Sequence, residues 1–263
     1  MSARLRTLQA RVLPHGPLDF VRQVVLFVAA FQLYRLVRGL ADDAEAATAA
    51  FSNARDLIHV EQALNIFVEP SLHAFASGQE WLLDAASWMY INAQTSITLG
   101  ALVWLYLFRN ESFYFVRNMF LVAFGLALVG YAVFPTAPPR FFPEWGFFDA
   151  VSDFTGVPQD SVTINELFNP YAAVPSMHVG FALMLGIPLV RLVRWRALKV
   201  FWALYPLLVV FVIVVTANHF IADAVLGAVA AGIGAIAARA MARARPQAWT
   251  FAPAQRLEAT AAP

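Results

Sequence analysis

The sequence predicts an all-α integral membrane protein: six transmembrane helices in a bundle, plus an amphipathic interfacial helix between the first and second spans. Of its 263 residues, 60% are hydrophobic and only 13% are charged, a balance that soluble domains rarely reach. Six apolar segments approach the roughly 20 residues that a helix needs to cross a bilayer. A net charge of +1 without a basic, aromatic-rich patch argues against a nucleic-acid partner, and the lack of cysteine excludes thiolate metal sites.

The apolar segments occupy most of the chain. Residues 1–245 are therefore predicted to form a single six-span domain, and the Ala- and Pro-rich tail at 246–263 is expected to be disordered. The predicted spans are residues 19–41, 82–108, 116–134, 177–193, 198–217 and 220–241.

The distribution of charged residues in the loops predicts how these helices are oriented in the membrane. Basic residues precede the first segment and follow the second, fourth and sixth, whereas the other two long loops are acidic. The positive-inside rule places the basic loops and both termini in the cytoplasm, so the acidic loops lie on the outer face. The preference for arginine over lysine and the abundant alanine favour a bacterial source, and hence a location in a bacterial plasma membrane.

Residues 42–79 contain no apolar run long enough to span. Apolar residues recur at roughly helical spacing on both sides of Glu61, which predicts an amphipathic helix lying on the outer interface. Pro70 restricts the residue before it and so ends or kinks this helix. We expect His73, in the same segment, to be solvated or to face lipid headgroups.

Two ionisable residues stand between the last two apolar segments. Charged side chains near the centre of a span cost about 2.5–3.5 kcal/mol on insertion scales and less near its ends, so they usually have a function. His219 and Asp223 are four residues apart, and a helix places them on one face. Asp223 can accept from one ring nitrogen of His219 and leave the other as a nucleophile. The alternative is a hydrogen-bonded pair that only stabilises a helix start.

Polar residues also open the fourth apolar segment. Ser176 follows a proline and precedes an apolar helical run, which favours an N-cap. The backbone N–H groups of a helix start, a serine hydroxyl and the imidazole of His178 together suit an anion such as phosphate. A capped span with a histidine at the headgroup level is the alternative interpretation.

A third polar group follows the third segment. Pro138 and Pro139 stiffen the exit from that helix and hold Arg140 near the outer surface, as a planar cation suited to phosphate. An arginine paired with lipid headgroups is the competing interpretation. Asn218 can also donate to phosphate, and Gly227, one turn beyond the acidic residue of the last segment, leaves room for a neighbouring helix.

Together these motifs resemble a known family. The order Pro-Pro-Arg, Pro-Ser-x-His and His-x-x-x-Asp-x-x-x-Gly, with six spans, resembles the type 2 phosphatidic acid phosphatase superfamily. The wider contexts at residues 134–140, 169–178 and 216–219 resemble its inositol phosphorylceramide synthase-like branch. The resemblance covers most of residues 20–240.

The resemblance implies a double displacement that uses no metal and no cofactor. His219 attacks phosphorus and forms a phosphohistidine, and Asp223 orients it. His178 protonates the leaving oxygen and then activates the incoming water or alcohol, general acid–base help typically worth about 10²–10⁴-fold. Arg140 and Ser176 hold the phosphoryl oxygens.

Two phosphate-binding cations of the superfamily are missing. The motif lysine is replaced by Val133 and the motif arginine by Ile213. The synthase-like branch also diverges at these points, so the departures favour that branch. Arg35 and Arg38, toward the outer end of the first segment, are candidates for compensating cations.

The predicted function is a membrane phosphotransferase or phosphatase that acts on a lipid phosphate at the outer face, including phosphoinositol transfer to a lipid hydroxyl. Its substrate is a phospholipid or a prenyl phosphate, and its acceptor is a lipid or water. A phosphatase that releases inorganic phosphate from polyprenyl phosphate or phosphatidate is the alternative. Two other classes remain: a transporter, which would place polar residues near the midplane, and a metal enzyme that uses the two histidines and the aspartate.

Overall fold

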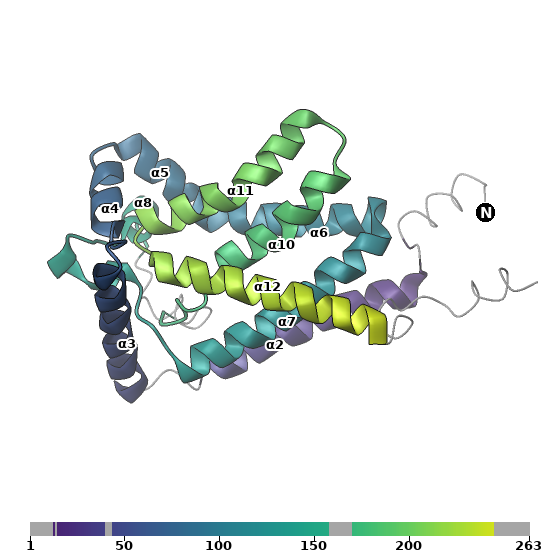
Figure 1. Cartoon of the computed structure of the whole chain (residues 1–263), viewed down its shortest axis with the longest axis horizontal. Helices are drawn as coiled ribbons and strands as arrows, with labels where there is room; N and C mark the ends of the chain where they lie inside the picture. Colours follow the sequence, from purple (N-terminus) through teal and green to yellow (C-terminus); the bar gives the residue numbers. More distant parts are fainter. Residues whose placement is uncertain (1–12, 14, 40–43, 158–169, 245–263) are drawn as a thin grey trace, which may run out of the picture.

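The computed structural model describes residues 13, 15–39, 44–157 and 170–244, and helices make up nearly all of this part of the chain (Figure 1). The all-α prediction is confirmed for these residues, because their one β pairing is an isolated bridge. The predicted tail at 246–263 lies outside the described residues. The α-helices are α2 (Pro17–Gly39), α3 (Ala44–Ala63), α4 (Glu69–Ser77), α5 (Glu80–Trp88), α6 (Gln94–Phe108), α7 (Asn110–Val133), α8 (Ala150–Thr155), α10 (Met177–Leu192), α11 (Arg196–Val215) and α12 (Ile221–Ala244).

Each of the six predicted spans is mostly helical in its described residues; residues 40 and 41 of the first span lie outside them. Among the described residues, four helices are long and apolar enough to cross a membrane: the continuous stretch Glu80–Phe108, then α7, α11 and α12. Helix α10 is apolar but has only 16 residues, and α2 has 23 residues with a lower mean hydropathy. The apolar helices are consistent with an integral membrane protein, while the count of six spans stays a prediction.

Small residues let the central helices approach closely. Helix α12 packs on α7 and on α10, and α10 packs on α11. A Cβ atom at Gly234 of α12 would lie 2.8 Å from the carbonyl oxygen of Met119 in α7. One at Gly227 would overlap the carbonyl oxygen of Ser176, at the start of α10. The predicted close approach of a neighbouring helix at Gly227 is therefore confirmed, as is typical of membrane helix packing.

The segment between the first two spans forms two helices instead of one. Helix α3 ends at Ala63, Asn65 adopts a left-handed conformation with φ of 56°, and α4 begins again at Glu69. Asparagine is among the residues that tolerate that conformation. Figure 1 shows α3 and α4 lying across one end of the bundle, transverse to the long helices. Whether they also contact a membrane interface stays a prediction.

One face of this pair packs against the bundle. Ala50, Ala54, Ile58 and Glu61 recur at helical spacing along α3, and each is at most 1% exposed. His73 of α4 is also buried: its Nδ1 lies 2.7 Å from a carbonyl oxygen at the end of α11, and its Nε2 accepts a backbone N–H at 3.4 Å. The expectation that His73 is solvated was therefore wrong, since both ring nitrogens bind the protein interior.

Substitution of Gly227 by alanine tests the packing of α10 on α12. We expect Gly227→Ala to destabilise the protein by about 1–3 kcal/mol, because a methyl group has no space beside Ser176. Gly232→Ala in the same helix is the matched control, since an added Cβ there meets no atom within 4 Å. Thermal unfolding in detergent, followed by circular dichroism, measures both. Equal midpoints would contradict the close approach.

Candidate active site

Three connections that are distant in sequence meet where α12 begins. They are the segment after α7, the segment before α10 and the turn between α11 and α12. Figure 1 shows that α12 starts at the end of the bundle covered by α3 and α4. The backbone hydrogen bonds that join the connections run from Thr136 N to Tyr171 O at 2.8 Å, from Arg140 N to Ala217 O at 2.9 Å and from Ser176 N to Asp223 O at 3.0 Å.

His219 and Asp223 form the predicted pair. Nδ1 of His219 lies 3.1 Å from Oδ2 of Asp223, which also accepts the backbone N–H of Phe220 at 2.9 Å. Asp223 is 0% exposed and His219 is 5% exposed. An aspartate fixed in this way determines which tautomer of the imidazole is present.

The surroundings keep His219 uncharged. Burial, and then the positive charge of Arg140, lower the pKa of His219 to about 3. An ordinary imidazole, with a pKa near 6.5, is partly protonated at neutral pH and would lose part of its nucleophilic form. The ring of His219 is neutral across the physiological range, as a nitrogen nucleophile requires.

A second histidine faces the first. His178, in the first turn of α10, has its ring centroid 5.4 Å from that of His219. It stacks on Tyr90 at 4.8 Å, and its backbone carbonyl accepts a hydrogen bond from Gln94 at 3.0 Å. Tyr90 belongs to a π-helical turn, η1 (Met89–Ala93), which interrupts the predicted second span. Such turns are frequent at functional sites, but no local sequence signal predicted this one.

Arg140 lies beside the histidine pair on a short 3-10 turn, η2 (Pro139–Phe141). Its Nη1 donates to Oδ1 of Asn218 at 2.7 Å, and its Nε lies 3.7 Å from Asp149. The amide nitrogen of Asn218 donates to the backbone and the hydroxyl of Thr216. Asn218 therefore orients Arg140 and does not offer its own amide to phosphate as predicted. Asp149 was not predicted.

Ser176 occupies the N-cap position of α10, but it makes no capping hydrogen bond. Its hydroxyl is fully buried and has no hydrogen-bond partner among the described residues. A buried hydroxyl without a partner costs free energy, about 1–3 kcal/mol in mutational data. The prediction of the N-cap position was correct and that of the capping bond was wrong, which leaves this hydroxyl available for another acceptor.

Two arginines of α2 are the predicted replacements for the missing motif cations. Arg35 and Arg38 lie near the end of α2, and their side chains are outside what the structure describes. Val133, at the position of the motif lysine, is exposed at the end of α7, and Ile213 is buried in α11. Ile213 has a different use: its carbonyl accepts the backbone N–H groups of Asn218 and His219.

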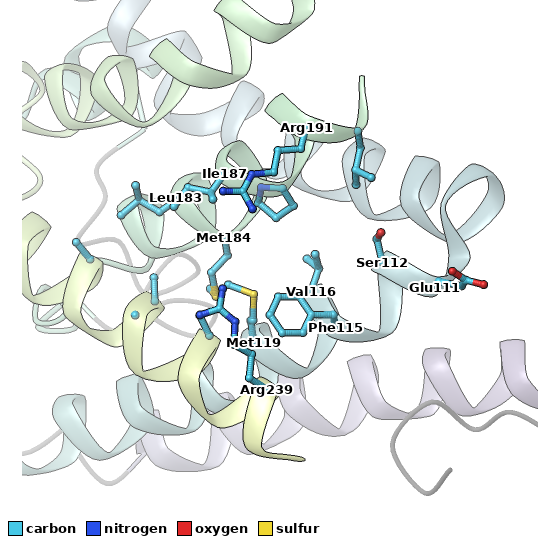
Figure 2. Close-up of a pocket in the computed structure, with 16 residues that line it drawn as sticks. Glu111, Ser112, Phe115, Val116, Met119, Leu183, Met184, Ile187, Arg191 and Arg239 are labelled. Carbon is cyan, nitrogen blue, oxygen red and sulfur yellow. The ribbon is translucent and has the colours of Figure 1, made fainter. Parts of the chain in front are cut away.

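Two cavities lie away from the histidines. One, of about 560 Å³, is lined by α7, α10 and α12 and includes Arg191 and Arg239, as Figure 2 shows. The other, of about 610 Å³, lies beside Arg109 and Arg194. Neither is lined by His178, His219 or Asp223, so neither is the candidate active site. Among the described residues, no group of three or more His, Asp or Glu side chains is arranged to hold a metal ion.

The fold and this site define an all-helical protein with apolar spans and a buried histidine–aspartate pair at one end of the bundle. Residues 55–237, more than half of the chain, match the family model of the PAP2 superfamily. The chain therefore belongs to this superfamily, which indicates a phosphatase or phosphotransferase activity. No curated protein and no solved structure matches the chain. The resemblance to the inositol phosphorylceramide synthase-like branch stays a prediction.

If Arg140 binds phosphate oxygens, Asn218 should control its affinity for them. We expect Asn218→Ala to weaken the binding of inorganic phosphate by roughly tenfold, because the guanidinium loses the acceptor that orients it. Asn218→Asp should weaken it at least as much, because a carboxylate would neutralise the cation. Isothermal titration calorimetry gives the affinities. Asn92→Ala, which removes an exposed amide, is the control, and equal affinities in all the variants would contradict this role.

Proposed function

We propose that this protein is a membrane enzyme that transfers or hydrolyses the phosphate group of a lipid through a phosphohistidine at His219. One observation carries the proposal: the buried His219–Asp223 pair, His178, Arg140 and the unpaired Ser176 hydroxyl converge from separate connections of a PAP2 superfamily chain. A nucleophile, its orienting acid, a second imidazole and a cation are the groups that phosphoryl transfer needs.

The first half of the reaction forms the covalent intermediate. The nitrogen of His219 that does not face Asp223 attacks phosphorus, and the P–O bond to the leaving alcohol breaks as the N–P bond forms. His178 gives its proton to the departing oxygen. Arg140 and Ser176 bind the phosphoryl oxygens, where charge must be stabilised in the transition state. Asp223 stabilises the positive charge on the phosphorylated ring.

The second half consumes the intermediate. An acceptor oxygen attacks phosphorus, His178 takes its proton, and the N–P bond breaks. Water as the acceptor gives a phosphatase, and a lipid hydroxyl gives a transferase, including transfer of phosphoinositol. The departures from the superfamily motifs at Val133 and Ile213 favour the synthase-like branch and therefore a transferase. None of these steps requires a metal ion.

The charge distribution supports an orientation. Basic residues gather at three places: at the junction of α6 with α7, at the junction of α10 with α11 and at the end of α12. Figure 1 shows all three at the end of the bundle opposite α3 and α4. By the positive-inside rule this end is cytoplasmic, so both termini are cytoplasmic and the site faces the outer side of a plasma membrane. A phospholipid or prenyl phosphate of that leaflet is the expected substrate.

Turnover of a lipid panel tests the proposal. Detergent-purified protein is assayed with phospholipids and prenyl phosphates, each with and without EDTA and with and without a ceramide or diacylglycerol acceptor. The products are identified by mass spectrometry. We expect His219→Ala to lower kcat by at least 10³-fold, because the covalent route is lost. His59→Ala, which changes an exposed histidine of α3, is the control.

The products separate the two reactions. Free phosphate that depends on His219 identifies a phosphatase, and a new phospho-alcohol lipid identifies a transferase. Unchanged turnover in His219→Ala would falsify the phosphohistidine mechanism. Loss of turnover on addition of EDTA would contradict a metal-independent reaction.

The two arginines of α2 are the proposed replacements for the missing cations. We expect Arg35→Ala and Arg38→Ala to lower kcat/KM for the lipid substrate by about tenfold each, because a charge-assisted contact to phosphate is lost. Arg22→Ala, nearer the start of the same helix, is the control. The hypothesis is wrong if both substitutions leave turnover at the wild-type level.

A further inference from the structure

Two buried acids from outside the motifs that resemble the family bind the first turn of α12. Oε1 of Glu61, in α3, accepts the backbone N–H of Ala222 at 2.6 Å. Oε1 of Glu69, the first residue of α4, accepts the backbone N–H of Ile221 at 2.8 Å. Both glutamates are 0% exposed. They reach α12 across 161 and 152 residues of sequence, so these contacts are part of the tertiary structure.

These contacts complete the capping of α12. The first N–H groups of a helix have no partner inside the helix, and burial makes an unsatisfied one costly. Phe220, Ile221 and Ala222 donate in turn to Asp223, Glu69 and Glu61. The same turn holds the aspartate that orients the candidate nucleophile. Its position is therefore set by α3 and α4 as well as by α12.

The three carboxyl groups are not all ionised. When all are charged, Glu61 Oε2, Glu69 Oε2 and Asp223 Oδ1 are buried without a donor among the described residues. The side chain of Glu69 acts on that of Glu61, and a hydrogen bond between two carboxyl groups requires a proton. Burial, and then contact with Glu69, raise the pKa of Glu61 to about 9, although the N–H of Ala222 acts in the opposite direction.

We propose that Glu61 and Glu69 are positioning residues that share one proton and hold the first turn of α12, so that Asp223 and His219 keep their reactive geometry. Neither glutamate needs to touch the substrate. The shared proton supplies a donor between the two carboxyl groups and removes one of the buried negative charges. The charged groups of the described residues that act on Glu61 are Glu69 from α4 and Asp223 from α12, and both are acidic.

Turnover, which rests on the proposed function, tests the positioning role. Glu61→Gln keeps an acceptor for Ala222 and a donor for Glu69, so we expect kcat within about twofold of the wild type. Glu61→Leu leaves the N–H of Ala222 without a partner and shifts the first turn of α12. We expect kcat to fall roughly ten- to hundredfold, with KM changed by less than about threefold, because displacements of about 1 Å reduce rates on this scale.

The matched control is Asp56→Leu, which removes an exposed carboxylate of the same helix. Its kcat should stay at the wild-type level. A Glu61→Leu variant as active as this control would overturn the positioning role. A Glu61→Gln variant as impaired as Glu61→Leu would overturn the shared proton, because glutamine supplies the same hydrogen bonds without a charge.

Stability against pH tests the same proposal without any substrate. A carboxyl whose pKa is about 9 in the folded protein and near 4.5 when unfolded keeps its proton only in the folded state between those values. The unfolded state is then favoured as pH rises through this window, so the wild-type midpoint should fall from pH 5 to pH 9 relative to Glu61→Gln. Asp56→Asn, as the control, should follow the wild type.

Turnover tests the proposed function and the pH dependence of stability tests the shared proton, so a failure of one can be told from a failure of the other. If no lipid is turned over but Glu61→Gln removes the fall in thermal midpoint, the proposed function fails and the shared proton stands. If lipids are turned over through His219 while wild type and Glu61→Gln show the same pH dependence of the midpoint, the function stands and the shared proton is wrong.

Discussion

The first turn of α12 presents backbone N–H groups in a buried environment, and the rest of the site depends on how they are satisfied. Each unsatisfied N–H would cost about 1–3 kcal/mol, and no side chain within α12 other than Asp223 reaches back to them in the described structure. Carboxyl groups from α3 and α4 supply the remaining acceptors. Helices α3 and α4, which lie across the end of the bundle, meet this requirement.

The same burial determines the chemistry of the site. It lowers the pKa of the His219 imidazole and raises that of the Glu61 carboxyl group. It also makes Arg140 dependent on Asn218, because a guanidinium in this setting needs an oriented acceptor. A buried hydroxyl on Ser176 that lacks a partner is consistent with a site built for an anion. A neutral imidazole, a cation and an unsatisfied donor are groups that the proposed phosphoryl transfer would use.

Close helix packing fixes the start of α10 relative to α12. The start of α10 approaches α12 at Gly227, where a side chain would overlap the carbonyl of Ser176. The backbone N–H of Ser176 in turn donates to the carbonyl of Asp223. His178, two residues further along, is therefore placed relative to His219 by main-chain contacts, and Tyr90 supports its ring from the other side. Main-chain contacts vary less than those of long side chains, as suits the fixed spacing of the two imidazoles that we propose to be catalytic.

The sequence by itself determined what depends on local spacing. Apolar runs predicted the helices, the interval of four residues placed His219 and Asp223 on one helix face, and Gly227 indicated a close neighbour. Only the tertiary structure decided the roles of Glu61, Glu69, Tyr90 and Asn218, and it showed that His73 is buried. Those residues act through partners in distant segments, and their surroundings exist only after the helices pack. The periodicity of a sequence predicts which face of a helix is apolar. It does not predict which polar groups of other helices will contact that helix.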